Sequence, residues 1–268
     1  MKCLHVADLH YNLRKFDWVV DAAGDVDLVI LAGDHLEISM YLDRPAQSVV
    51  VRKYFKRIRE RAPLLISSGN HDLDVRDTAG ERICRWIGKA RALDVPTDGD
   101  SPVIGDTLFS LCPWWDGDRV KHEMIRQIEQ DALKQPKRWI WVHHAPPQDS
   151  PTSWTGKRFF GDQELRALIE RFQPDAVLSG HVHQSPYIDG GSWADRIGRT
   201  WIFNAGHQLG PVPSHVLIDT EDGTAYWKCL GRGETVQLDA PLERPIPQMS
   251  DAPDWMRFMD RLLDQDPL

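Results

Sequence analysis

The chain has 268 residues, of which 41% are hydrophobic and 27% charged, so it can bury the core of one large or two small domains and is not a disordered chain. Its formal net charge of −8, from 32 Lys and Arg against 40 Asp and Glu, makes the whole chain a poor match for long polyanions such as duplex DNA. No run approaches the roughly 18 apolar residues of a membrane span, and residues 1–13 lack the apolar stretch of a secretory signal, so we expect a cytoplasmic protein with no membrane partner.

Short apolar runs alternate with helical patterns through the first two thirds of the chain, which is typical of an α/β fold. We expect buried strands at residues 2–7, 27–32, 63–67, 139–142 and 175–178. Apolar residues recur at helical spacing in 45–62 and 118–133, and Asp162 is expected to cap a further helix.

The pattern changes near residue 200, where short strands at 200–204, 215–219 and 224–230 alternate with turns. We expect them to form a second, more antiparallel sheet that completes a domain of residues 1–233. Residues 234–268 read as a Pro-rich link and a C-terminal amphipathic helix that docks on the body or, alternatively, on a partner or second subunit; the oligomeric state stays open. The apolar face of that helix contains Trp255, Phe258, Met259, Leu262 and Leu263.

The four cysteines lie far apart and form no C-x-x-C pair. Neither a disulfide framework nor a thiolate zinc site is therefore expected, and all four are interpreted as buried small apolar residues.

Metal-type ligands follow every one of the five expected strands. They are Asp8 and His10 after the first, Asp34 after the second, Asn70, His71 and Asp72 after the third, His143 and His144 after the fourth, and His181 and His183 after the fifth. Because the carboxyl ends of strands in an open α/β sheet share one edge, we expect these side chains to meet in one crevice.

This donor set suits first-row divalent ions such as Mn, Fe, Co, Ni or Zn, because it consists of imidazoles, carboxylates and one amide without thiolates. These ligands are too many for one ion, and seven of them would fit two ions that share a carboxylate, since adjacent cations repel and need an anionic bridge. A hydroxide held by both ions is a nucleophile at neutral pH. The pattern therefore indicates hydrolysis at an anionic centre.

The order D-x-H, G-D, G-N-H-D, H-H-x-P and G-H-x-H resembles the calcineurin-like binuclear metallophosphoesterase superfamily over about residues 1–220. The resemblance implies two mixed β-sheets packed as a sandwich and flanked by helices, and a metal-dependent phosphoesterase with two divalent ions, manganese being favoured. It implies that one ion is held by Asp8, His10, Asp34 and His183. It implies that the other is held by Asp34, Asn70, His143 and His181, with Asp34 as the bridge.

The resemblance also implies that His71 is a free imidazole that stabilises the phosphoryl oxygens or protonates the leaving group, with Asp72 orienting it or bracing its loop. His143 and His144 are adjacent and point opposite ways if the strand continues, so only one can be a ligand. The family's spacing favours His143. In place of the usual Asn-Pro-Gly segment the chain has Asn-Ala-Gly-His, which makes His207 a site-facing candidate, with an ordinary surface histidine as the alternative.

Substrate choice is expected to depend on loops. Loop tryptophans either stack a nucleobase or pin the loops in place, and they are Trp114, Trp115, Trp154 and Trp193. Lys157 and Arg158 could bind a phosphate oxygen. The candidate substrate residues are Trp154, Lys157, Arg158 and His207.

We expect hydrolysis of a phosphodiester or phosphomonoester in a nucleotide-like or other phosphorylated small molecule. The alternative is a DNA or RNA nuclease of the same superfamily, favoured by a basic helix at residues 52–61 and weakened by the short region after Gly233. A non-catalytic scaffold is a third reading, and the retention of every ligand position together with His71 argues against it.

Overall fold

The computed structural model describes residues 1–249 and Met256. The first of its two six-stranded sheets has the strand order β14-β13-β12-β1-β2-β3. Its strands are β1 (Lys2–Val6), β2 (Leu28–Ala32), β3 (Leu64–Ser67), β12 (His215–Asp219), β13 (Thr224–Cys229) and β14 (Arg232–Gln237). β1, β2 and β3 are parallel, whereas β12 runs antiparallel to β1, so the sheet is mixed.

The second sheet has the order β10-β11-β9-β8-β7-β6. Its strands are β6 (Val103–Ile104), β7 (Thr107–Leu111), β8 (Arg138–Val142), β9 (Ala176–Ser179), β10 (Ala194–Ile197) and β11 (Thr200–Asn204). The four central strands are parallel and the two edge strands antiparallel. A separate hairpin consists of β4 (Val75–Arg76) and β5 (Arg82–Ile83).

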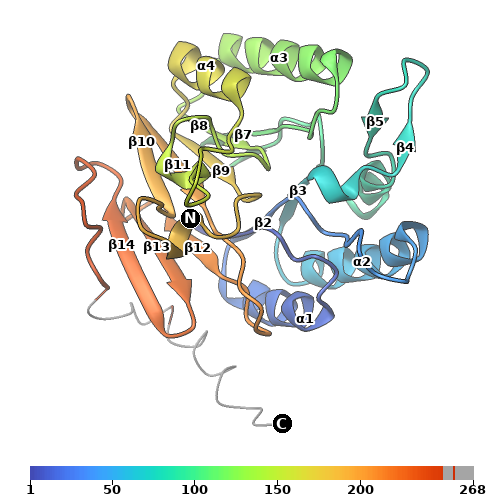
Figure 1. The fold of residues 1–268 in the computed structure, drawn as a ribbon, viewed down its shortest axis with the longest axis horizontal. Helices are drawn as coiled ribbons and strands as arrows, with labels where there is room; N and C mark the ends of the chain where they lie inside the picture. Colours follow the sequence, from blue (N-terminus) through green and yellow to red (C-terminus); the bar gives the residue numbers. More distant parts are fainter. Residues whose placement is uncertain (250–255, 257–268) are drawn as a thin grey trace.

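Four α-helices cover the sheets. They are α1 (Leu13–Ala22), α2 (Arg44–Arg59), α3 (Asp118–Leu133) and α4 (Gln163–Phe172). α1 and α2 lie on one side and α3 and α4 on the opposite side (Figure 1). Asp162 caps α4 as expected, because its carboxylate accepts a hydrogen bond from the Leu165 amide. Short 3-10 helices span Ala23–Asp25, Asn70–Asp72, Ile87–Leu93, Pro151–Ser153 and Ser185–Tyr187.

The fold has four layers: α1 with α2, the first sheet, the second sheet, and α3 with α4. An apolar core lies between each layer and the next. Phe16 and Phe55 pack α1 and α2 against the first sheet, and Met124 and Leu168 pack α3 and α4 against the second. The middle core, between the sheets, contains Ile30, Phe109 and Phe203 among others. The expected sandwich of two mixed sheets flanked by helices is therefore confirmed.

The expected grouping of strands into sheets was wrong. Strands from before and after residue 200 occur in both sheets, since β11 pairs in parallel with β9 while β12 pairs with β1. The five strands that carry the ligand motifs are likewise divided, with β1, β2 and β3 in the first sheet and β8 and β9 in the second. Strands buried on both faces read alike in sequence, so their pattern does not reveal which sheet they join.

The first sheet continues past the boundary expected after Gly233, because β14 pairs with β13 as far as Gln237. The following link packs on the body: Ile246 is buried in the middle core, and the Thr235 amide donates to the Pro247 carbonyl. The residues expected to form the apolar face of the C-terminal helix lie outside the described part of the chain.

All four cysteines are unpaired, and three of them are buried while Cys84 is half-buried. Within residues 1–249, no helix combines the length and apolar character needed to cross a membrane.

Candidate active site

The loops after strands of both sheets meet at one edge of the sandwich. Asp8, which follows β1, accepts a hydrogen bond of 3.0 Å from the backbone amide of His181, which follows β9 in the other sheet. Nε2 of His183 lies 3.1 Å from Oδ1 of Asp8, a contact between residues 175 positions apart. The expected convergence therefore occurs across the two sheets, rather than along the edge of one.

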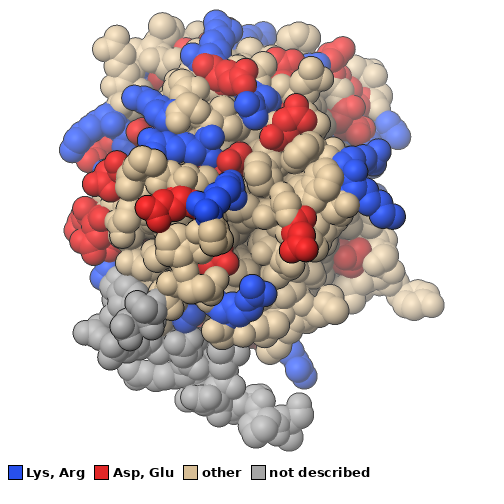
Figure 2. Space-filling view, turned by 60° about the vertical axis from the view of Figure 1, so that its left-hand side comes forward, with Lys and Arg blue, Asp and Glu red and all other residues tan. Residues whose placement is uncertain are grey.

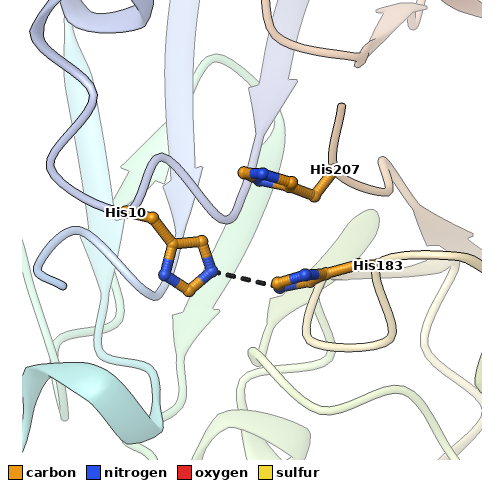
Figure 3. Close-up of side chains that lie close together, drawn as sticks. All are labelled: His10, His183 and His207. Atoms are coloured by element: carbon orange, nitrogen blue, oxygen red, sulfur yellow. Dashed lines mark hydrogen bonds between the residues drawn. The ribbon is translucent and has the colours of Figure 1, made fainter. Parts of the chain in front are cut away.

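Three imidazoles form the first cluster of ligand-type atoms. Nε2 of His10 lies 3.0 Å from Nε2 of His183, and the His207 ring stacks on that of His183 with centroids 4.7 Å apart (Figure 3). The three rings approach from loops that follow β1, β9 and β11. His207, a candidate in the sequence, thus faces the site, where its Nδ1 lies 2.7 Å from the carbonyl oxygen of Asp8.

Asp34 belongs to two further clusters, one with His144 and His181 and one with His10 and His71. Its Oδ2 lies 3.1 Å from Nε2 of His144 and 3.8 Å from Nε2 of His10. This carboxylate is therefore common to two sets of imidazoles, as expected for a shared ligand.

His144, not His143, faces this site, so the preference drawn from family spacing was wrong. The His143 ring instead stacks on Trp115, with centroids 4.5 Å apart and an interplanar angle of 13°. Strand alternation explains the result, because Ile140 and Val142 face the middle core and His144, two residues further on, points to the same side. There its Nδ1 lies 2.7 Å from the carbonyl oxygen of Ala32 at the end of β2. Burial and the neighbouring His144 lower the pKa of His143 to about 3.

His71 and Asn70 belong to the 3-10 helix after β3. The backbone amide of His71 donates to Oδ1 of Asp34 at 2.9 Å, and its ring Nε2 lies 3.9 Å from Oδ2. Oδ1 of Asn70 is buried without a hydrogen-bond partner. A buried amide oxygen left unpaired beside carboxylates and imidazoles is the arrangement expected of a cation ligand.

Asp72 braces the loops and does not orient the His71 ring. Its buried carboxylate accepts hydrogen bonds from the backbone amides of Gly69, His35 and Leu36 at 2.9, 3.0 and 3.1 Å. These bonds tie the loop after β3 to the loop after β2. Of the two roles expected for Asp72, its hydrogen bonds therefore favour bracing the loop over orienting His71.

Glu37 lies in the site and was missed by the sequence analysis. Its Oε2 lies 3.2 Å from Nδ1 of His10, and its Oε1 lies 3.7 Å from Nδ1 of His71. Buried Gln47 on α2 holds the Glu37 backbone, because it accepts from the Glu37 amide and donates to the Glu37 carbonyl. The signal in the sequence is an acidic residue three positions after Asp34, farther from its strand end than Asp34 itself.

The site strongly favours positive charge. Burial disfavours ionisation of Asp34, but the charge and hydrogen bond of His144, together with the charge of His71, outweigh it and lower the Asp34 pKa to about 2. Burial likewise opposes ionisation of Asp8, yet His144, His10 and His183 hold its pKa well below the usual range. Two buried carboxylates that stay ionised favour the binding of a proton or a metal cation.

The backbone is strained at these positions. Asp8, Asp34 and His181 have φ angles of 56°, 52° and 66°, in the left-handed region that residues other than glycine rarely adopt. At Gly180 a Cβ would overlap the Asp8 carboxylate, so only glycine lets the two loops approach. Such strain collects at functional sites, where the surrounding structure over-determines the conformation.

Lys15 on α1 is a second residue that the sequence did not single out. It is buried, and its Nζ lies 3.2 Å from Nδ1 of His207. Burial lowers the pKa of Lys15 to about 8, and burial together with Lys15 lowers that of His207 to about 4. The pair adds a cationic group behind the first cluster.

The substrate candidates divide into two groups. Trp154 pins its loop, since its Nε1 donates to the Asp189 carbonyl at 3.0 Å, and Trp193 is buried in the middle core. Lys157 and Arg158 are exposed, and the Arg158 guanidinium lies 5.3 Å from the Phe160 ring centroid. By contrast, Trp114 and Trp115 contact histidines of the site region.

The sequence profile described as calcineurin-like phosphoesterase matches residues 1–185. Among curated proteins, no sequence was significantly similar to the chain. Several solved structures share the fold. TT1561 of Thermus thermophilus has a TM-score of 0.57 and 14% identity, over 88% of this chain and 98% of that one. The purple acid phosphatase PPD1 from yellow lupin (Lupinus luteus) seeds has a TM-score of 0.54 and 14% identity, over 89% of this chain and 51% of that one.

A dimetal phosphatase from Danio rerio has a TM-score of 0.51 and 9% identity, over 85% of this chain and 95% of that one. At such low identity these structures establish similarity of fold. The sequence profile covers more than half of the chain and includes every motif from the D-x-H segment to the G-H-x-H segment. The protein belongs to the calcineurin-like phosphoesterase family.

Proposed function

We propose that this protein is a metal-dependent phosphoesterase that uses two divalent cations to hydrolyse a phosphodiester or phosphomonoester of a small molecule. One observation carries the proposal: Asp34 is common to two clusters of ligand-type atoms, one with His144 and His181 and one with His10 and His71. A shared, ionised carboxylate is what two adjacent cations need, because their mutual repulsion must be offset.

The donor atoms suit such a pair of ions. On one side of the shared Asp34 the ligands would be Asp8, His10 and His183. On the other side the ligands would be Asn70, His144 and His181. The mixture of imidazole, carboxylate and amide favours manganese or another first-row divalent ion. When bound, the cations would supply Lewis acidity and lower the pKa of water.

His71 is the side chain best placed to act on the phosphoryl group itself. Its Nδ1 faces Glu37 and its Nε2 faces the Asp34 side of the site. A carboxylate that faces one ring nitrogen helps to orient an imidazole so that the other nitrogen points into the site. We therefore assign to His71 the protonation of the leaving oxygen or the stabilisation of phosphoryl oxygens.

Charge favours a small substrate over a long nucleic acid. The net charge is −8, and Figure 2 shows acidic and basic side chains interspersed over one face of the molecule. On α2, Arg57 pairs with Asp17 at 3.0 Å, and Arg59 at the end of the helix bonds Asp94 at 2.7 Å. Arginines that are already paired with carboxylates are typical of a solvated helix face, rather than of a surface that binds the phosphates of a nucleic acid.

The test compares hydrolysis of bis-p-nitrophenyl phosphate, p-nitrophenyl phosphate and labelled single-stranded DNA, each with Mn²⁺ and with a chelator. We expect Mn²⁺-dependent release of nitrophenol from one or both small esters. Cleavage of DNA alone would indicate a nuclease instead. No hydrolysis of any substrate with Mn²⁺, Zn²⁺, Fe²⁺, Co²⁺ or Ni²⁺ would indicate a non-catalytic protein.

A further inference from the structure

A cavity of about 460 Å³ opens directly beside the metal-type cluster. Asn70 and His181 of that cluster form part of its lining, together with three large aromatic residues. These aromatic residues are Trp114, Trp115 and Phe160. The volume lies within the range of pockets that hold small ligands.

The aromatic lining is held in place by the site itself. The Phe160 ring stacks on His181 with centroids 5.2 Å apart, and Trp114 packs against the same imidazole at 4.9 Å. Trp115 stacks on His143, and the Trp114 amide donates to Oγ of Ser68 at 3.0 Å. Rings fixed before the ligand arrives lose little entropy on binding.

Phe160 is 48% exposed, and the other part of its ring covers His181 of the metal-type cluster. Its neighbour Phe159 instead packs against Trp154, with centroids 4.9 Å apart. An aromatic side chain that is half in solvent and half over a site imidazole presents a flat apolar surface that a planar group can cover.

The polar rim of the cavity carries no excess charge. Arg82 binds Asp116 through two hydrogen bonds of 2.9 and 2.7 Å, and Lys121 pairs with Asp118 at 2.9 Å. Paired charges do not attract additional phosphates, but they offer donors and acceptors at fixed positions. The cavity therefore fits an uncharged planar group with polar edges.

We propose that this cavity binds the base of a nucleoside phosphate ester, with Trp115 and Phe160 as its stacking surfaces, while the phosphate lies at the metal-type cluster. This inference rests on the proposed phosphoesterase function for the position of the phosphate. It names the substrate class as a nucleotide-type ester, rather than a sugar or lipid phosphate.

Binding is measured by calorimetry on chelator-treated protein, with AMP and ribose 5-phosphate as the two probes. The wild-type protein is expected to bind AMP more tightly than ribose 5-phosphate by about 5- to 100-fold, the value of stacking one base. Phe160→Ala and Trp115→Leu are expected to reduce this ratio several-fold. Phe159→Ala is the matched control, because Phe159 packs on Trp154, and it should retain the ratio.

Equal affinities for AMP and ribose 5-phosphate, or an AMP preference that survives both Phe160→Ala and Trp115→Leu, would overturn the assignment. So would much tighter binding of a single-stranded oligonucleotide with a steep salt dependence, which would indicate a nucleic-acid groove. Hydrolysis of nitrophenyl esters with Mn²⁺ tests the phosphoesterase function separately. If those esters are cleaved and the AMP preference is missing, the pocket assignment alone fails; if AMP stacks and no ester is cleaved, the function fails.

Discussion

Nε2 of His144 lies 3.1 Å from Oδ2 of Asp34, although the two residues follow strands of different sheets. This contact joins the two halves of the sandwich at the site. The buried Nδ1 of the same His144 ring lies 2.7 Å from the Ala32 carbonyl, so the ring orientation is fixed before any ion binds.

Replacing Asp34 by Asn should abolish tight binding of both cations, because the shared ligand loses its charge. The measurement is a metal count by mass spectrometry after loading with Mn²⁺ and desalting. Asp106→Asn, at an exposed carboxylate paired with Lys137, is the control and should keep the wild-type count. Two ions retained by Asp34→Asn would contradict the shared-ligand assignment.

The adjacent histidines offer a matched pair of substitutions. His144→Phe should weaken binding of one of the two ions by more than about tenfold, since its imidazole faces Asp34. His143→Phe preserves an aromatic ring against Trp115 and should leave both ions bound. Titration calorimetry with Mn²⁺ distinguishes the variants, and the reverse result would restore His143 as the ligand.

Replacing His71 by Ala should lower the rate by roughly 10²- to 10⁴-fold with near-normal metal content, if its ring transfers a proton or stabilises the phosphoryl group. Glu37→Gln should lower the rate less than His71→Ala does, because the orienting carboxylate is lost and the imidazole is kept. Glu60→Gln, at the exposed residue directly after α2, serves as control. An unchanged rate in His71→Ala would remove that residue from the mechanism.

Acid should destabilise the metal-free fold through His5. Burial lowers its pKa to about 4, and its Nε2 donates to the Ser179 carbonyl at 2.9 Å. The unfolded chain protonates this group near pH 6.5 and the folded chain only near 4, so stability present above pH 6.5 is lost as pH falls between these values. The loss should approach about 3 kcal/mol.

Urea unfolding from about pH 4.5 to 7.5 in the presence of a chelator measures this loss. His5→Gln should reduce the dependence of unfolding free energy on pH by the share of one histidine, while buried His143 and His207 keep the rest. His122→Gln, at an exposed position of α3, should retain the full dependence. Equal slopes in the wild-type protein and His5→Gln would show that His5 does not contribute.

Local patterns predicted the elements well where periodicity was strong. α3 spans the expected residues 118–133, and β11 and β12 have the expected bounds. β7 (Thr107–Leu111) was not anticipated, because Thr107 and Ser110 interrupt its short apolar run, although both are buried. Sheet membership depends on long-range pairing, which short apolar runs do not encode.

In the candidate site, the strand-end motifs predicted which loops would meet. The sequence could not establish the orientation of His143 and His144, which depends on which face of β8 meets the middle core. Glu37 escaped notice because it reaches the histidines only through the fold of its loop around Gln47. Trp114 and Trp115 could be separated from Trp154 and Trp193 only once the loops were placed in space.

Anomalous scattering from crystals grown with Mn²⁺ tests the central claim most directly. We predict two peaks roughly 3.5–4 Å apart, one on each side of the Asp34 carboxylate. A single peak, or none at this position, would contradict it.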